Sequence, residues 1–576
     1  MPVLSNRRLQ LARRLVSLNA GAWSGLPQQL AAYWRNIKRD RALNADQAAF
    51  RHYPAPIFRE AFARAGGHPR ILFACFNDFL QEIKYDLMFA AALADQGARP
   101  MVLTRRGCGA VRRYWSDCGL EDQIYYLEDW ETKNPGPSDD LECLLGNGAE
   151  PEISKLLSLH YRDVAVGRWA LADSFASLRR SASELNDPHA CQVLRSALLD
   201  SYQTTDAVYR ALEAVRPDKI IFLEKGYTPA GQLYEAALGR GIDIIQYVHA
   251  HASDVLMIKR YHPGNRYAHM SQPSEKTWHQ ALRASDDPDL PRKVQTQILQ
   301  SYARGEWFNR KYGQVGKRYL SPEELAATLK LDGSRRTAVI FTHVGWDATF
   351  FYGENLFADY DEWLVETARA ASRLDNVNWV VKVHPDNLWK SHASRSLDGV
   401  DRDRRLIERS LGGIPSNIRW IGPETHIRTD AMFGVTDFCL TVRGTIGLEM
   451  ACMGKHVLTA GTGRYSGYGF TLDSSSVSEY MTLLTRLHEL PPPSAEQTAQ
   501  AALYVNSVIW LRPLKMLSSK DVRLALDRLG KDALGDNLIF TFADMVDFSK
   551  ASDLAAFTNW LSNTMDEDLI ANPCVA

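Results

Sequence analysis

The sequence predicts an α/β protein with two Rossmann-like domains facing a cleft, with helical extensions at both ends. Apolar runs with the length of buried strands alternate with helical patterns in two parts of the chain, beginning at Arg70 and at Thr337. Such alternation is typical of parallel sheets covered by helices. The chain has 576 residues, which is more than one hydrophobic core usually serves, so at least two domains are expected.

These patterns divide the chain into four parts. We expect a basic helical extension over 1–64, an N-terminal domain with a helical insertion over 65–320, a C-terminal domain over 321–475, and further helices over 476–576. The extension alternates arginines with leucines and tryptophans. Two readings stay open: peripheral contact with the anionic inner face of the plasma membrane, or a solvated helix packed on the next domain.

The composition narrows the class of protein. The formal net charge is -1, which argues against bulk electrostatic binding of nucleic acid. The eight cysteines include no C-x-x-C pair, so we expect reduced thiols in a cytoplasmic protein, with neither a disulfide framework nor a zinc site. No apolar run approaches the length of a membrane span.

Three short acidic runs, at 287–289, 401–403 and 566–568, lie in polar, loop-like or terminal segments. We expect them to be solvated surface, and we therefore expect no metal site. His249 and His251 are two residues apart in an extended segment. That spacing points them to opposite faces and argues against a shared ion.

Residues 437–461 predict a strand, a turn, a short helix and a second strand. Arg443 and Thr445 come at the predicted N-terminus of the helix, where free N–H groups and the helix dipole favour a phosphate. Glu449 follows Thr445 by one turn and can face the same side, as a ligand of ribose hydroxyls would. The alternative is an ordinary crossover in which Thr445 caps the helix.

Other polar residues follow predicted strands, and ligands of open α/β sheets gather at the carboxyl ends of strands. Glu224 comes directly after a buried strand, where a carboxylate is rarely needed for folding. It is therefore the strongest candidate for a catalytic group in the first half, and an ion pair with Lys225 is the alternative. Further candidates are Asp78, Glu82, Asp347, Lys382, His384 and, in the glycine-rich loop 461–470, Arg464.

Three motifs, at 382–385 (KVHP), 443–449 (RGTIGLE) and 454–455 (GK), resemble the second domain of GT-B glycosyltransferases. They are similar in particular to the capsular polysaccharide biosynthesis proteins, a group that includes the retaining Kdo transferases. Residues 343–364 and 222–227 look like the same group.

The resemblance implies a donor nucleotide bound mainly by the C-terminal domain. Its phosphate and ribose contacts would come from Lys382, His384, Arg443, the amides of Gly444 and Thr445, and Glu449. The acceptor would lie near Asp78, Glu82 and Glu224, and either Glu224 or Asp78 would act as the base or as a nucleophile. Asp347 and Arg464 are further candidates for substrate contacts.

The implied function is metal-independent transfer of a sugar from a nucleotide-activated donor to a growing bacterial surface polysaccharide, either capsule or O-antigen. The donor, with a CMP-Kdo-like sugar among the candidates, is a substrate, and no cofactor is expected. The acceptor is a glycan or a lipid-linked glycan. The alternatives are another GT-B-fold enzyme (a sugar-nucleotide epimerase, a polyol-phosphate transferase or a phosphoribosyl-diphosphate-dependent transferase) and a non-catalytic scaffold of a polysaccharide assembly complex.

Overall fold

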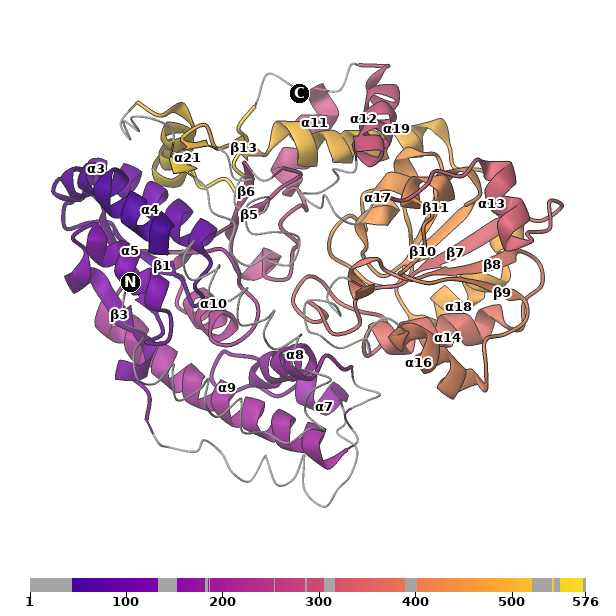
Figure 1. The fold of residues 1–576 in the computed structure, drawn as a ribbon, viewed down its shortest axis with the longest axis horizontal. Helices are drawn as coiled ribbons and strands as arrows, with labels where there is room; N and C mark the ends of the chain where they lie inside the picture. The colour runs from indigo at the N-terminus through magenta and orange to yellow at the C-terminus, as the bar shows by residue number, and fades with distance from the viewer. Residues whose placement is uncertain are drawn as a thin grey trace, which may run out of the picture.

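The computed structural model describes residues 44–132, 153–181, 185, 187–252, 254–284, 287–304, 316–388, 401–520, 541–542 and 550–572. The predicted membrane contact of the basic extension concerns residues that lie mostly outside these ranges. Within them, no helix has both the length and the apolar character that crossing a bilayer requires. Two lobes, each built on one β-sheet, lie side by side (Figure 1).

The N-lobe contains a seven-stranded sheet in the order β13-β6-β5-β4-β1-β2-β3. Its strands are β1 (Arg70–Ala74), β2 (Arg99–Thr104), β3 (Ile124–Tyr126), β4 (Lys219–Phe222), β5 (Asp243–His249), β6 (Val255–Tyr261) and β13 (Leu514–Lys515). The first five strands run parallel, whereas β6 pairs antiparallel with β5, and β13 with β6.

The C-lobe contains a six-stranded, fully parallel sheet in the order β12-β11-β10-β7-β8-β9. Its strands are β7 (Thr337–Phe341), β8 (Asn378–Lys382), β9 (Ile418–Ile421), β10 (Phe438–Thr441), β11 (His456–Thr459) and β12 (Leu472–Asp473). Every residue of β7, β10 and β11 is buried, as expected for parallel strands with helices on both faces of the sheet. The predicted two-domain α/β fold is thereby confirmed.

Helices connect and cover the strands. In the N-lobe they are α3 (Pro54–Phe62), α4 (Leu80–Asp95), α5 (Gly109–Asp117), α7 (Ile153–Leu157), α8 (Val166–Leu178), α9 (Pro188–Val215) and α10 (Ala230–Gly239). In the C-lobe they are α13 (Pro322–Leu329), α14 (Tyr360–Ala371), α16 (Arg402–Leu411), α17 (Thr445–Cys452) and α18 (Val477–Thr485). Between the two sheets in the chain, α11 (Glu275–Ala284) and α12 (Leu290–Arg304) pack against α19 (Ala495–Asn506).

Each sheet has a switch point beside its first strand. The chain places β2 on one side of β1 and β4 on the other, and it places β8 and β10 on the two sides of β7. The connections therefore leave the sheet in opposite directions there, which opens a crevice at the carboxyl ends of the strands where ligands of such folds bind. The fold thus predicts a site at the ends of β7 and β10 in the C-lobe, and of β1 and β4 in the N-lobe.

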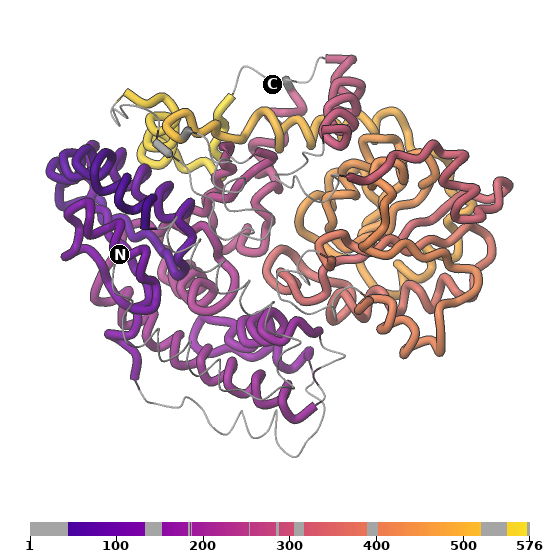
Figure 2. The backbone as a smooth tube through the Cα atoms, in the orientation of Figure 1, coloured from indigo at the N-terminus to yellow at the C-terminus, as the bar shows by residue number. Residues whose placement is uncertain are grey.

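The chain returns to the N-lobe after the C-lobe is complete. A π-helical turn, Ser507–Leu511, follows α19, then β13 joins the edge of the N-lobe sheet, and α21 (Ser552–Asn563) packs against α4. Figure 2 shows this last part of the tube, in yellow, beside the indigo N-terminal helices. Residues 476–576, which were expected to be helical, therefore also contain β-strands. After β13, the two-residue strands β14 (Ser519–Lys520) and β15 (Thr541–Phe542) pair antiparallel.

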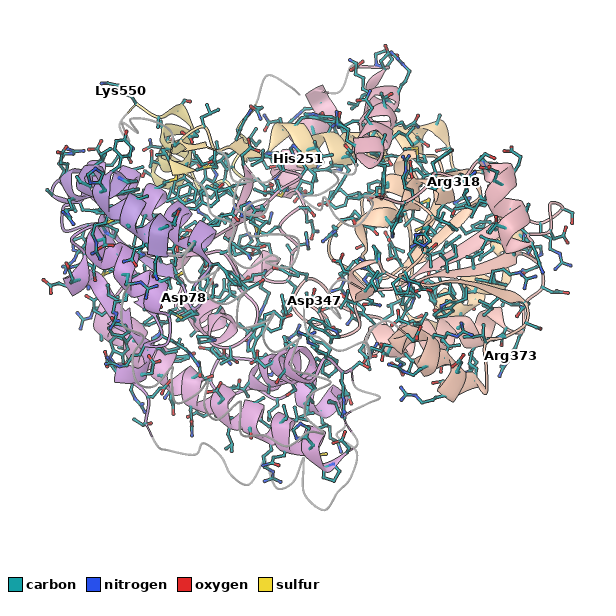
Figure 3. The ribbon with its side chains drawn as sticks, in the orientation of Figure 1. Asp78, His251, Arg318, Asp347, Arg373 and Lys550 are labelled. Carbon is teal, nitrogen blue, oxygen red and sulfur yellow. The ribbon has the colours of Figure 1, made fainter. Side chains whose placement is uncertain are left out.

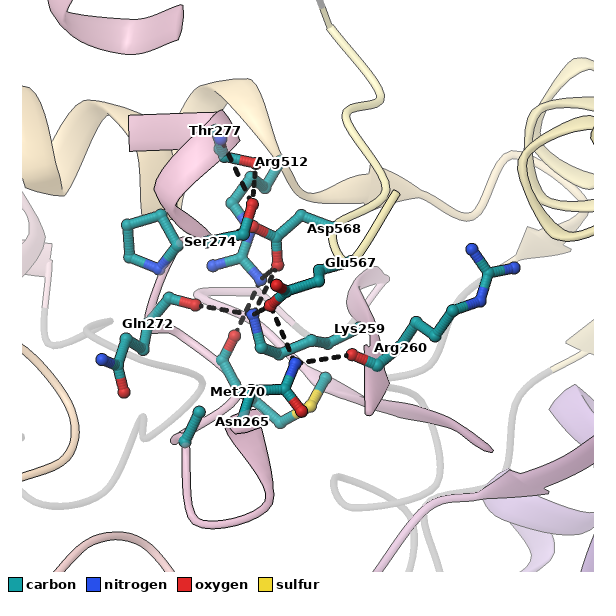
Figure 4. Close-up of polar contacts among 12 residues, drawn as sticks. Lys259, Arg260, Asn265, Met270, Gln272, Ser274, Thr277, Arg512, Glu567 and Asp568 are labelled. Atoms are coloured by element: carbon teal, nitrogen blue, oxygen red, sulfur yellow. Dashed lines mark hydrogen bonds and ion pairs between the residues drawn. The ribbon is translucent and has the colours of Figure 1, made fainter. Parts of the chain in front are cut away.

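A buried ionic cluster holds this C-terminal segment against the N-lobe (Figure 4). The Asp568 carboxylate accepts hydrogen bonds from Lys259 Nζ on β6 at 2.9 Å and from Arg512 Nη2 at 2.6 Å, and all three side chains are almost fully enclosed. The expectation that 566–568 is solvated surface is therefore wrong for Asp568. It is wrong for Asp403 too, which is buried and accepts from the Thr342 hydroxyl at 2.7 Å.

Candidate active site between the lobes

A cavity of about 620 Å³ lies between the lobes, at the switch point of the C-lobe sheet. The N-lobe contributes residues that follow β5 and β6, and the C-lobe contributes the loops after β7, β8 and β10. Figure 3 shows Asp347, one of the lining residues, in the space between the two lobes. The site residues from the sequence that line the cavity are Asp347, Lys382, His384, Arg443, Gly444, Thr445, Glu449 and Arg464.

Arg443 is the most unusual group in the cavity wall, since it is only 6% exposed. Its Nη2 donates to the Glu354 carbonyl at 2.9 Å and to the Asn355 side chain. Its Nε and Nη1 are enclosed and have no hydrogen-bond partner among the described residues, nor does any described carboxylate pair with it. Burial lowers the pKa of Arg443 from its usual value. A buried guanidinium with two open donors favours an anion beside it.

His343 adds a neutral donor next to Arg443. Its Nε2 accepts from the Val442 amide at 3.1 Å, which leaves the ring proton on Nδ1. Burial, with Arg443 and Arg464 nearby, lowers the pKa of His343 to about 3, so the imidazole stays uncharged. His343 is not among the site residues predicted from the sequence, although it follows β7 as closely as His384 follows β8.

Arg464 reaches the cavity from the glycine-rich loop after β11. Its Nη2 lies 2.8 Å from Nε2 of His269, a residue of the N-lobe. Burial and the nearby cations, Arg464 first among them, lower the pKa of His269 well below its usual value. The Arg464 side chain thus bridges the two lobes across the cavity.

Lys382 and His384 lie on the other side of β7 from Arg443, because β8 and β10 flank that strand. Strands are about 4.8 Å apart, so Arg443 is separated from Lys382 and His384 by roughly 10 Å at the sheet. Burial and the neighbouring Lys317 lower the pKa of Lys382 to about 7. His384 Nδ1 accepts from the Asp386 amide at 3.1 Å, so Nε2 carries the proton and is a donor.

The first turn of α17 is arranged differently from the simple phosphate cradle that the sequence suggests. The Gly444 amide donates to the Thr441 hydroxyl at 3.0 Å and is thereby engaged. Glu449 is buried, and its Oε2 accepts from the Tyr302 hydroxyl of α12 at 2.5 Å. Tyr302 therefore already orients the Glu449 carboxylate that a ribose hydroxyl would contact. No local pattern in the sequence indicates this contact between Tyr302 and Glu449.

Glu224 does not line the cavity itself, but it contacts the hydroxyl group of a residue that does. Its Oε1 accepts from the Gly226 amide at 2.9 Å and from the hydroxyl of Tyr352, a lining residue, at 3.2 Å. The alternative ion pair with Lys225 does not form, because the Lys225 amine instead donates to the Arg266 carbonyl at 2.9 Å. Burial raises the pKa of Glu224 from its usual value.

The remaining N-lobe candidates lie apart from the cavity. Asp78 is exposed, and its Oδ1 accepts from the Ala110 amide in the first turn of α5 at 2.7 Å, so it serves that helix as a cap. Figure 3 places Asp78 within the N-lobe. Glu82 is buried in the first turn of α4. Asp347, in contrast, lines the cavity and accepts from the Tyr227 hydroxyl at 3.2 Å.

Comparisons with known proteins give similarities of fold. No family model and no curated protein matches the chain. Similar solved structures include two from Thermosulfurimonas dismutans. The KpsC β-Kdo 2,4 transferase has 12% identity and a TM-score of 0.30, over 50% of this chain and 79% of that one. The KpsC β-Kdo 2,7 transferase has 13% identity and a TM-score of 0.30, over 54% and 82%.

A UDP-GlcNAc 2-epimerase from Neisseria meningitidis, bound to UDP-GlcNAc, has 13% identity and a TM-score of 0.25, over 76% of this chain and 95% of that one. At these TM-scores the likeness does not decide which reaction the chain carries out. Kdo transferases and a sugar-nucleotide epimerase are among the proteins that this chain is similar to.

Proposed function

We propose that the chain is a glycosyltransferase that binds a nucleotide-activated sugar in the cavity between its lobes. The observation that carries this proposal is the buried Arg443 guanidinium, whose Nε and Nη1 have no partner among the described residues. A phosphate oxygen pair matches the planar fork of an arginine and supplies the missing negative charge. The position at a topological switch point is where nucleotides bind in folds of this kind.

The same groups suit the chemistry of sugar transfer. The leaving group is a nucleotide phosphate, and negative charge builds on it as the bond to the sugar breaks. Arg443, Arg464 and the uncharged His343 are fixed donors whose positions are set before the reaction, which is the arrangement that stabilises a developing anion. Glu224, reached through Tyr352, is the group that takes the proton of the acceptor hydroxyl.

We further propose that the acceptor is a glycan or lipid-linked glycan of a bacterial surface polysaccharide, with a CMP-Kdo-like sugar as one candidate donor. The motifs at 382–385 and 443–449, which resemble capsular polysaccharide biosynthesis proteins, support this finer assignment.

A thermal-shift screen tests the proposal. CMP, UDP, GDP, CDP, dTDP and phosphoribosyl diphosphate would be compared on wild type and on His384→Ala. A ligand that binds the native state raises its melting temperature. We expect one nucleotide to stabilise wild type and to lose most of that effect in the variant. If none binds at millimolar concentration, the non-catalytic scaffold becomes the better reading. Conversion of a sugar nucleotide without any acceptor would indicate an epimerase instead.

Replacing Glu224 by glutamine is expected to lower turnover by at least about 10²-fold while nucleotide binding is kept, because the amide cannot accept a proton. Asp78→Asn is the matched comparison, since Asp78 caps α5 away from the cavity. Asparagine caps a helix about as well as aspartate does, so this change is expected to leave both stability and turnover nearly unchanged. Near-wild-type turnover in Glu224→Gln would remove that residue from the mechanism.

Nucleotide affinity is expected to fall as the pH rises above 7, because the pKa of Lys382 is lowered to about 7 by burial and by Lys317. Below pH 7 the amine is already charged. Above it, binding an anion must take up a proton, which costs up to about tenfold in affinity per pH unit. Titration calorimetry with a nucleoside diphosphate from pH 7 to 9 measures this slope. Lys382→Arg should flatten it, and a flat wild-type profile would show that Lys382 does not contact the ligand.

A further inference from the structure

A thiol and two carboxylates are gathered inside the N-lobe, behind the carboxyl end of β1. Cys75 directly follows that strand, and Glu82 and Asp86 lie one turn apart on α4. One potential ligand atom from each of the three lies within 4.8 Å of the other two. None of the three is more than 2% exposed. They are the only such group of metal-ligating side chains in the part of the chain that the structure describes.

The negative charge of this cluster has no described counter-ion. Carboxylates four residues apart on a helix repel each other, and the repulsion is stronger away from water. The nearest lysine on the helix, Lys84, pairs instead with Asp46 at 2.7 Å. No described lysine or arginine forms an ion pair with Glu82 or Asp86.

The hydrogen bonds of the two carboxylates show that one oxygen atom has no partner. Asp86 Oδ1 accepts from the Tyr247 hydroxyl at 2.7 Å, and Glu82 accepts from the side chain of Asn77. Glu82 Oε2 is enclosed and has no hydrogen-bond partner among the described residues. A cation beside this oxygen would satisfy its open lone pairs.

We propose that Cys75, Glu82 and Asp86 bind a divalent metal ion of the zinc type, at a site separate from the nucleotide cavity. A thiolate ligand selects zinc or a similar borderline ion over magnesium and calcium, which prefer oxygen alone. Three protein ligands with a water molecule complete a tetrahedral site. Tyr247, which donates to Asp86, orients one of the ligands, as outer groups commonly do at metal sites.

The site would join the end of β1 to the helix that follows it, α4. Cys75 begins the loop that leads to α4, and Asp78 in this loop caps α5. The sequence does not predict the site, because the spacing of 75, 82 and 86 matches no common zinc motif. Neither the short acidic runs nor the paired histidines of the sequence indicate this cluster, which depends on the helix that follows β1.

Metal analysis of the full chain tests the proposal. Protein purified without chelator is expected to carry about one equivalent of zinc, and Zn²⁺ added to chelated protein should raise its melting temperature. Co²⁺ added in its place should give the near-ultraviolet band of a thiolate bound to cobalt. Because binding displaces the thiol proton, Zn²⁺ affinity should rise with pH, by up to about tenfold per unit.

Cys75→Ala and Glu82→Gln are expected to lose the bound metal and the Zn²⁺-dependent shift. Cys452→Ala removes an equally buried thiol from the C-lobe and should keep both. The proposal is overturned if wild type gives no cobalt–thiolate band and no zinc-dependent shift. It is also overturned if Glu82→Gln retains stoichiometric zinc. Nucleotide binding is measured separately, so its failure would leave this site standing.

Discussion

Replacing Asp568 by alanine is expected to lower the free energy of unfolding by about 3–5 kcal/mol, because it leaves two buried cations without their shared counter-charge. The Asp568 carboxylate lies 2.9 Å from Lys259 Nζ and 2.6 Å from Arg512 Nη2, and it also accepts from the Ser274 amide. Thermal or urea unfolding of the full chain measures the loss. Asp568→Asn, which keeps the shape but not the charge, should show most of it.

The pH dependence of Asp568 has a defined sign. Burial opposes ionisation, but Arg512 and Lys259 outweigh it and lower the pKa of Asp568 to about 2. Its contribution to stability is therefore complete above about pH 4 and is lost as the pH falls towards 2.

Asp566→Ala is the control for Asp568→Ala, since the Asp566 side chain is 42% exposed and pairs with an exposed lysine. That change should cost less than about 0.5 kcal/mol, and a loss equal to that of Asp568→Ala would contradict the interpretation.

Replacing Arg443 by leucine is expected to weaken nucleotide binding by about 10²-fold or more, since charge-assisted hydrogen bonds contribute about 1.5–3 kcal/mol each. The same change should leave the melting temperature of the free protein unchanged or higher. The reason is that leucine removes a buried charge whose Nε and Nη1 have no described partner. Opposite effects on stability and on binding are the signature of a group retained for its ligand.

Arg336→Leu is the control that distinguishes the effect of losing Arg443 from the effect of losing a structural arginine elsewhere in the C-lobe. Arg336 lies at the opposite end of β7 from the cavity, where it donates to the carbonyl groups of Leu487 and Leu490. Its replacement should lower stability and leave nucleotide binding unchanged. If Arg443→Leu destabilises the free protein as much as Arg336→Leu does, then Arg443 has a structural role.

The parts of the fold that the sequence predicts are those with local signals. Buried parallel strands such as β7 and β10 are continuous apolar runs, and the helix between β10 and β11 shows helical spacing. The sequence does not predict β3, β6 or β13. In β6 the adjacent Lys259 and Arg260 look like a solvated surface. Both are buried by partners about 300 residues later in the chain, which no local pattern reveals.

The candidate site, too, has features that the sequence predicts and features that only the structure shows. Lys382, His384, Arg443 and Glu449 could be predicted to line one cavity, because the carboxyl ends of neighbouring parallel strands meet at one edge. What each side chain bonds to could not be predicted. The link from Tyr302 to Glu449 depends on how α12 packs against the C-lobe, and only the tertiary structure supplies it.

The late pairing of β13 with β6 has a consequence for how the chain folds as it is synthesised. About 250 residues separate the two strands in the sequence. At 5–20 residues per second, the edge of β6 waits roughly 10–50 s on the ribosome for its neighbour. During that time the edge presents open backbone groups, the feature by which unfinished sheets aggregate. Lys259 on this strand then lacks its counter-charge, because Asp568 has not yet been made, and a lysine on an open edge discourages pairing with another chain. A cation that later holds the C-terminal segment thus protects the nascent N-lobe before that segment exists.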